Sequence, residues 1–342
     1  MLADIRARGY GAWRFDDTHQ SLHHRLASVL ASLEHSVTDE LETLLSSTEF
    51  VVLPIFGQDG QPEYQIEIHL GQPVGLTLRS SMPRCGTHRS CWRHYPEVMS
   101  ATMEIPEIRR AADRAVTRTP WLKSRHSFSF GDHYDPDNTH HGLLLVNNDD
   151  IVEPGTGFGT HPHRDMEIVT WVLQGELTHR DSAGNRGVVY PGLAQRMSAG
   201  SGILHSEKND SHTERVHFVQ MWVVPDVTGI SPGYQQCEID ADLMSNDLVT
   251  IATGIPGHDA AISLHNRSAA LHGARLRPGA AVELPAAPYL HLFVPRGRLD
   301  VEGIGELQQG DAVRFTDADG RRVTADEPSE VLIWEMHAKL GG

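Results

Sequence analysis

The stretch "GTGFGTHPHRDMEIVTWVLQG", from Gly155 to Gly175, carries two histidines one residue apart, followed by a β-branched and aromatic run typical of a strand. Side chains alternate faces along a strand, so His161 and His163 project to the same side, about 7 Å apart along the backbone. Pro162 between them donates no ladder hydrogen bond, which suits an edge or bulged position. The stretch therefore predicts β-structure in which two imidazoles converge on one metal ion.

The same spacing recurs in "QRMSAGSGILHSEKN", where His205 and Glu207 are again two residues apart behind Gly200 and Gly202. Two such pairs on neighbouring strands would supply three imidazoles and one carboxylate. This donor set suits a divalent first-row metal such as Fe(II), and the absence of thiolates argues against a closed structural zinc site. Four protein ligands would leave two octahedral positions for substrate and dioxygen, which favours catalysis or sensing over a structural role.

From Trp121 to the C-terminus, short apolar runs alternate with Gly, Pro, Asn and Asp turns, the pattern of an all-β sandwich or barrel. "PRGRLDVEGIGELQQGDAVRF" (295–315) echoes "LQGELTHRDSAGNRGVVYPGLAQRM" (173–197), which indicates a duplicated unit. We therefore expect two β domains, at 103–235 and 236–342. The second should hold no metal, because it has no His-x-His pair on a strand and its histidines are scattered, at His258, His265, His272, His291 and His337.

Residues 1–102 have a different pattern. Leucines and valines at three- and four-residue steps between Ser21 and Leu45 predict one long helix, or two helices broken near Thr38. "EFVVLPIFG", the alternating run from Tyr64 to Leu70, and "VGLTL" predict strands. We expect a small α+β extension of unknown function. Because Met103 could itself start a chain, a fused partner and an over-long gene assignment both remain open.

Composition restricts the classes of function. The 342 residues contain 29 Lys plus Arg against 45 Asp plus Glu, a net charge of -16 that opposes direct, sequence-independent binding to nucleic acid. Three cysteines are too few for a disulfide framework, which favours a reducing, cytoplasmic location. The first residues lack an apolar signal region, and no run approaches a membrane span of about 20 residues, so we expect neither secretion nor membrane insertion.

The motifs "GFGTHPHRDMEIVTWVLQGELTHRDSAGN", "QRMSAGSGILHSEKN" and "SRHSFSFGDHYDP" closely resemble those of the pirin family, a bicupin branch of the cupin superfamily. The resemblance covers roughly residues 104–342, and Gly200 stands where cupins commonly have proline. It implies two tandem cupin barrels with one metal ion, in the first. Many cupins take a ligand from the glutamate of the first motif, which would nominate Glu167, whereas pirins take it from the second, here Glu207. We expect Glu167 to be a second-shell or structural carboxylate. The resulting ligand set is His161, His163, His205 and Glu207.

The resemblance also implies a function: opening of a flavonol or related enol or catechol ring by dioxygen, as in quercetin 2,3-dioxygenases. Fe(II) is the expected metal, with Mn, Ni, Cu, Co and Zn as alternatives, and Glu207 is the expected catalytic base. The small aromatic substrate would lie against four side chains that otherwise belong to the core or satisfy backbone groups: Phe158, Met166, Gln220 and Trp222. Two other classes stay open, a redox-sensing regulatory protein that acts through a protein partner, and a metal-free cupin scaffold.

Overall fold

The computed structural model describes residues 50–56, 62–69, 75–80 and 106–341. The chain divides into two compact units, Met1–Ile105 and Pro106–Gly342. In the first, β1 (Phe50–Phe56), β2 (Pro62–His69) and β3 (Gly75–Ser80) form an antiparallel sheet in that order, which confirms the three strands predicted there. The helix predicted over 21–45 lies outside the described residues.

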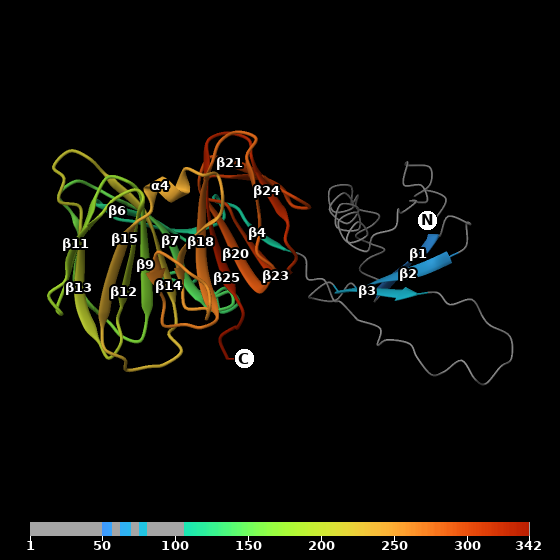
Figure 1. Ribbon diagram of the computed structural model, residues 1–342, viewed down its shortest axis with the longest axis horizontal. Helices are drawn as coiled ribbons and strands as arrows, with labels where there is room; N and C mark the ends of the chain where they lie inside the picture. Colours follow the sequence, from blue (N-terminus) through green and yellow to red (C-terminus); the bar gives the residue numbers. More distant parts are fainter. Residues whose placement is uncertain (1–49, 57–61, 70–74, 81–105, 342) are drawn as a thin grey trace. The chain divides into compact units, whose positions relative to one another are not determined.

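The second unit consists of two successive barrel-like halves, each built from a seven-stranded and a four-stranded sheet (Figure 1). In the first half the sheet orders are β15-β12-β9-β14-β7-β6-β5 and β11-β10-β13-β8. Its strands are β5 (Ala115–Arg118), β6 (Leu122–His126), β7 (Leu144–Val152), β8 (Gly157–His163), β9 (Glu167–Gln174), β10 (Leu177–Asp181), β11 (Arg186–Val189), β12 (Leu193–Ser198), β13 (Ile203–Lys208), β14 (Val216–Val223) and β15 (Gly233–Glu238).

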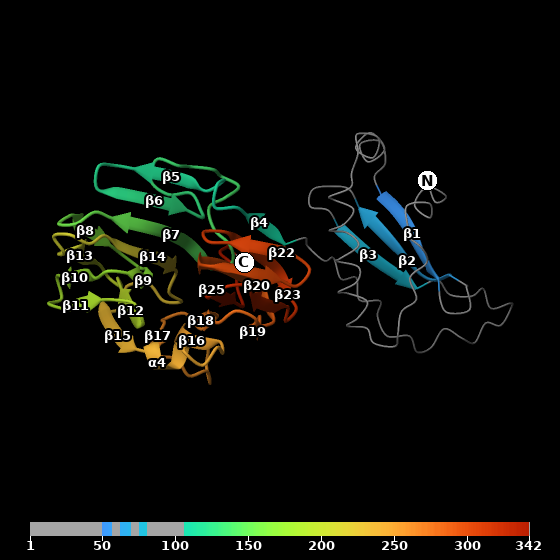
Figure 2. The same cartoon turned by 90° about the horizontal axis from the view of Figure 1, so that it is seen from above.

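The second half repeats this arrangement, with sheets β17-β16-β18-β25-β20-β23-β4 and β19-β24-β21-β22 (Figure 2). The repetition confirms the predicted pair of tandem β-barrels. The strands are β4 (Glu107–Arg109), β16 (Val249–Thr253), β17 (Ile262–Ser263), β18 (Ala269–Leu276), β19 (Ala281–Glu283), β20 (Ala287–Arg296), β21 (Arg298–Val301), β22 (Gly305–Gln308), β23 (Ala312–Ala318), β24 (Arg322–Ala325) and β25 (Ser329–Met336). Helix α4 (Asp240–Leu243) joins the halves, and none of the helices in the described part of the chain could cross a membrane.

Two strands lie close to the expected limits of the first domain. The division expected between residues 235 and 236 falls inside β15, which pairs with β12 from Gly233 to Glu238. At the other end, β4 precedes the first barrel in sequence but pairs with β23 of the second barrel. Strand pairing therefore joins residues on either side of position 235/236, and it joins β4 to a strand of the second barrel.

The two seven-stranded sheets pack face to face across a shared apolar core. Trp171 on β9 and Trp334 on β25 are fully buried in it, and the Trp171 indole Nε1 donates to Glu330 Oε1 at 2.6 Å. The second barrel has a separate apolar cluster in its interior, which includes Leu292, Phe315 and Ile333. Each large side chain buried in this way contributes about 1.5–3 kcal/mol. The first barrel differs, because polar side chains occupy part of its interior.

Candidate metal centre

Strands β8 and β13 bring the three predicted histidines together. His161 lies directly opposite His205 in the antiparallel register, and His163 lies opposite Ile203. The imidazole ring centroids are 4.9 Å apart for His161 and His163, 4.4 Å for His161 and His205, and 4.9 Å for His163 and His205. One nitrogen from each ring lies within 4.8 Å of the other two, a spacing that one metal ion could close.

A register shift between β8 and β13 separates this histidine group from Glu207. His205 pairs with His161, but Glu207 pairs with Phe158, so three steps along β8 match two along β13. Such a bulge re-aims side chains beside a site. Gly157 allows the strands to meet here: its φ is 144°, and a Cβ on it would lie 2.3 Å from the Glu207 carbonyl oxygen. The glycine-rich approach to the histidines therefore serves a close backbone contact.

Glu207 points into the barrel and is held from both sides. Its Oε2 accepts a hydrogen bond from Gln220 Nε2 at 2.7 Å, and its Oε1 accepts a longer one from Thr170 Oγ1 at 3.4 Å. One carboxylate oxygen lies in a second group, with nitrogens of His205 and His179 within 4.8 Å. His205 is thus common to both groups. His179 was outside the predicted ligand set, although "LTHRD" places it on a strand beside Asp181.

Burial keeps His163 and His205 in the form that binds metals. Burial and the neighbouring His161 lower the pKa of His163 to about 4, and burial with three nearby histidines lowers that of His205 to about 2. Burial raises the pKa of Glu207. Neutral imidazole is the metal-binding form of histidine. The donor set therefore fits a divalent cation.

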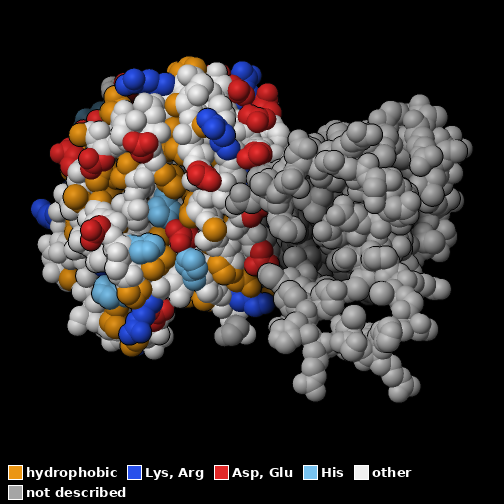
Figure 3. All heavy atoms as spheres, turned by 45° about the vertical axis from the view of Figure 1, so that its right-hand side comes forward, with side chains coloured by type: hydrophobic (Ala, Val, Ile, Leu, Met, Phe, Trp, Pro, Cys, Tyr) orange, Lys and Arg blue, Asp and Glu red, His pale blue; other side chains and the backbone are white. Residues whose placement is uncertain are grey.

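The hydrogen-bond inventory also fits a cation. Both ring nitrogens of His205, Nε2 of His163 and Nδ1 of His179 are buried without a partner among the described residues. Buried polar atoms are normally satisfied, so four orphaned nitrogens in one place indicate a missing group. Several histidine side chains lie among apolar and acidic side chains on the face of the described unit that Figure 3 shows.

The four side chains predicted to contact substrate have different surroundings. Phe158 packs on the apolar interior of the first barrel, and its ring meets Trp121 edge-on at 5.1 Å. Met166 packs on a small buried cluster around Ile168. The side-chain amide of Gln220 donates a hydrogen bond to Glu207. Trp222 is half-buried; its ring meets His163 edge-on at 4.8 Å, and its Nε1 donates to Gln220 Oε1 at 3.1 Å.

Glu167 lies on the opposite face of β9 from Thr170, whose hydroxyl reaches Glu207. Its Oε2 accepts hydrogen bonds from the backbone N–H of His265 at 3.1 Å and approaches His265 Nδ1 at 3.2 Å, while Arg196 Nε lies 3.8 Å away. Through His265 these contacts tie β9 of the first half to the second half. Glu167 stays a predicted carboxylate outside the ligand set.

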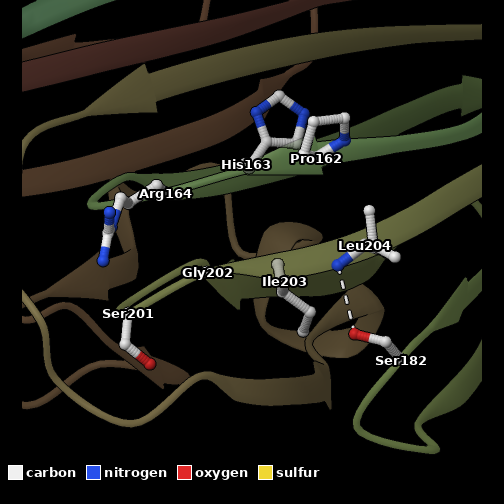
Figure 4. Close-up of a pocket in the computed structure, with 8 residues that line it drawn as sticks. All are labelled: Pro162, His163, Arg164, Ser182, Ser201, Gly202, Ile203 and Leu204. Carbon is white, nitrogen blue, oxygen red and sulfur yellow. Dashed lines mark hydrogen bonds between the residues drawn. The ribbon is translucent and has the colours of Figure 1, made fainter.

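A surface hollow of about 540 Å³ adjoins the site at the neighbouring ends of β8 and β13 (Figure 4). His163 borders it together with Arg164, Ser201 and Leu204, and Ser182 Oγ accepts the backbone N–H of Leu204 at 3.1 Å. Leu204 alternates with Ile203 and His205 along β13, so it faces away from the donors. Of the four predicted ligands, His163 therefore borders the hollow.

Comparison with known proteins agrees with this arrangement. Residues 109–223 match the model of the pirin family, and residues 256–336 match that of the quercetinase C-terminal cupin domain. A Mycobacterium tuberculosis protein, whose name assigns it provisionally to the quercetin 2,3-dioxygenases, is 77% identical over 243 residues, 71% of this chain and 98% of its own length. The quercetin 2,3-dioxygenase of Escherichia coli K12 is 38% identical over 230 residues, 67% of this chain and 97% of its own.

Solved structures show the same relationship. A bacterial pirin from Escherichia coli in complex with nickel(II) aligns with a TM-score of 0.63 at 34% identity, covering 68% of this chain and all of that one. Sequence motifs, barrel arrangement and family matches therefore agree over residues 109–223 and 256–336. The chain belongs to the pirin family.

Proposed function

We propose that this chain is a metal-dependent dioxygenase of the quercetin 2,3-dioxygenase type, acting on a flavonol or a related enol or catechol. The observation that carries the proposal is the convergence of neutral, unpartnered nitrogens of His163 and His205 beside the buried carboxylate of Glu207. The name of the Escherichia coli relative supports the substrate class. Fe(II) suits the N3O donor set, and Mn, Ni, Cu, Co and Zn remain alternatives.

Each residue of the site has a role in this reaction. His161, His163 and His205 would hold the ion together with Glu207. When bound, the ion supplies Lewis acidity that makes the flavonol 3-hydroxyl more acidic, and it offers open positions for oxygen ligands. Glu207 Oε1, the carboxylate oxygen with the longer hydrogen bond, accepts the proton of that hydroxyl. Gln220 keeps the other carboxylate oxygen in place by donating to it.

The atoms of the proposed reaction balance. Both atoms of dioxygen are incorporated as the enol ring opens, and one ring carbon leaves as carbon monoxide. Trp222, half-buried beside His163, provides an aromatic wall for the flavonol, and the apolar side chains that pack with Met166 limit the access of water to it. The chain thus binds, orients and deprotonates the substrate.

Turnover of quercetin in air is the direct test. Purified protein loaded separately with Fe(II), Mn(II), Ni(II), Cu(II) or Co(II) is mixed with quercetin, and the flavonol absorbance is followed beside a His161→Ala control. We expect metal-dependent loss of absorbance and carbon monoxide release, both abolished in the control. No turnover with any of the five metals would refute the proposal for quercetin. Capture of a protein partner in only one oxidation state of the metal would then favour the regulatory alternative.

A further inference from the structure

A second half-buried aromatic ring, Phe130, continues the row of rings that begins at His163. Trp222 meets His163 edge-on at 4.8 Å, and Phe130 meets Trp222 edge-on, with centroids 5.6 Å apart and an interplanar angle of 76°. Phe130 follows β6 in the connection to β7, whereas Trp222 lies near the end of β14. Two segments far apart in the chain therefore place two nearly perpendicular aromatic rings beside a predicted metal ligand.

His126 supports the Phe130 ring from the end of β6. The two rings stack, with centroids 5.1 Å apart and an interplanar angle of 24°. His126 is buried, and both of its ring nitrogens have partners: Nε2 lies 2.8 Å from Thr117 Oγ1, and Nδ1 lies 2.9 Å from Asn148 Oδ1. Because these hydrogen bonds fix the plane of the imidazole, the surface on which Phe130 packs is fixed as well.

The backbone around Phe130 is held in a tight turn. Its N–H donates to the carbonyl of His133 at 2.9 Å, and its carbonyl accepts the N–H of His133 at 3.0 Å. Gly131, inside the turn, has a φ of 57°, a conformation that favours glycine. Next to the turn, Ser129 Oγ donates to the Asp135 carbonyl and accepts the Asp135 N–H, both at 2.8 Å. Phe130 is therefore preorganised, so a ligand that packs on it does not have to order the loop.

A flavonol has its groups in a matching order. Its aryl ring is attached to the carbon next to the one that carries the 3-hydroxyl, so the two groups occupy neighbouring positions. When the hydroxyl lies at the predicted ligands, the row of rings beyond His163 runs through Trp222 to Phe130. Two nearly perpendicular rings offer a planar aryl group one stacked and one edge-on contact, the two geometries that aromatic pairs prefer.

We propose that Phe130 is a specificity-determining residue, which contacts the aryl ring of the substrate. The inference rests on the proposed function and narrows its substrate class to enols that carry an aryl group next to the enol hydroxyl. An enol with an alkyl group at that position reaches the same metal centre but makes neither aromatic contact. Phe130 takes no part in holding the metal, so its removal should change which ligand binds and leave the metal in place.

Binding in the absence of oxygen tests this assignment on the Ni(II)-loaded full chain. Two ligands with the same hydroxyl and carbonyl are compared: 3-hydroxyflavone, which carries a phenyl group next to the hydroxyl, and 3-hydroxy-2-methylchromone, which carries a methyl group there. Isothermal titration calorimetry gives the dissociation constant of each. In Phe130→Leu we expect the Kd of 3-hydroxyflavone to rise about two- to tenfold, the equivalent of one aromatic contact, and that of the methyl compound to stay unchanged.

Two further variants separate the contact from an effect on folding. Phe130→Tyr keeps the ring and should keep the wild-type preference for 3-hydroxyflavone. Tyr289→Leu removes a half-buried ring on β20 that meets His141 edge-on at 5.8 Å, and it should leave both dissociation constants unchanged. Equal changes for the two ligands in Phe130→Leu, or no change for either, would overturn the inference. A wild-type chain that binds neither ligand would overturn it as well.

Turnover in air distinguishes a failure of this inference from a failure of the proposed function. If 3-hydroxyflavone binds with the expected dependence on Phe130 but no metal supports turnover, the dioxygenase reaction fails and the assignment of Phe130 stands. If both ligands are turned over with kcat/KM values that Phe130→Leu lowers equally, the reaction stands and the assignment fails.

Discussion

Gln220 donates a hydrogen bond of 2.7 Å from its Nε2 to Oε2 of Glu207, and this contact fixes the carboxylate in the barrel interior. The two residues lie on β14 and β13, which belong to different sheets of the first barrel. Gln220 in turn accepts from the Trp222 indole. Gln220, which the sequence predicted to contact substrate, therefore orients Glu207, the predicted carboxylate ligand.

Removing this donor should weaken metal binding. In Gln220→Leu the buried carboxylate loses its shorter hydrogen bond, and we expect a fall in metal affinity and in kcat/KM of about 10- to 100-fold, the usual effect of losing an orienting partner. Competition with a chelator measures the metal affinity, and quercetin turnover measures kcat/KM. The control is Gln308→Leu, a glutamine of the second barrel that likewise donates to a glutamate carboxylate, Glu306 Oε1 at 2.9 Å, and it should change both quantities by less than about threefold. Equal losses in the two variants would argue against a specific role for Gln220.

Trp222 should affect substrate binding more than metal binding. Its ring meets His163 edge-on and extends toward Phe130, whose centroid lies 5.6 Å away. In Trp222→Leu an aromatic contact worth about 0.5–1.5 kcal/mol is lost, so KM for the flavonol should rise up to about tenfold. Metal content, measured by elemental analysis, should stay near the wild-type value. An emptied metal site with unchanged KM would reverse this interpretation.

Gly157→Ala should disturb Glu207 without touching any ligand. The added Cβ would lie 2.3 Å from the Glu207 carbonyl oxygen, so β8 and β13 would have to separate at the bulge. We expect a loss of about 1–3 kcal/mol in the free energy of unfolding, together with weaker metal binding. Gly155→Ala is the matched control, because Gly155 also has a positive φ of 69° but nothing within 4 Å of the added Cβ. Metal affinity that falls equally in both variants would contradict the explanation.

We expect Glu335, in the second barrel, to make a pH-dependent contribution to the free energy of unfolding. Its oxygens contact Nε2 of His272 at 2.8 Å and Nε2 of His337 at 2.7 Å, and the hydrogen bond from His272, followed by that from His337, outweighs burial and lowers the pKa of Glu335 from 4.5 to about 2. A lowered folded-state pKa stabilises the protein above pH 4.5 and loses that contribution as the pH falls toward 2.

The variant Glu335→Gln should therefore cost about 2 kcal/mol at pH 7, the order of a hydrogen bond to a charged group, and less at pH 3. Urea unfolding of both proteins at the two pH values measures the difference. A cost that is the same at pH 7 and pH 3 would show that the carboxylate charge does not contribute.

The sequence allowed part of this site to be predicted because the necessary signals are local. A two-residue period places His161 with His163, and His205 with Glu207, on one face whatever the sheets do. The partners of Glu207 could not be predicted in this way. Gln220 reaches it from the other sheet, and His179 reaches it through β10–β13 pairing, which no local pattern specifies.

The face of β9 on which Glu167 lies could not be predicted from the sequence either, for a different reason. In β9, from Glu167 to Leu173, every residue is buried, because one face of the strand lines the first barrel and the other packs in the core between the halves. A strand buried on both faces lacks the alternation of apolar and polar residues that would separate inside from outside. The pairing partners of β4 and β15 could not be predicted from local pattern either, because they lie far away in the sequence or in the other half.

The central claim is that Glu207, and not Glu167, is the carboxylate of a metal centre formed with His161, His163 and His205. The most direct measurement is the metal content per chain, by elemental analysis, of wild type, Glu207→Gln and Glu167→Gln after identical loading and dialysis. We expect about one ion per wild-type chain and near-complete loss of the ion in Glu207→Gln, since charged ligands dominate such sites. Glu167→Gln should keep the metal content of the wild type, although the folded chain should be less stable. A full site in Glu207→Gln with an empty one in Glu167→Gln would contradict it.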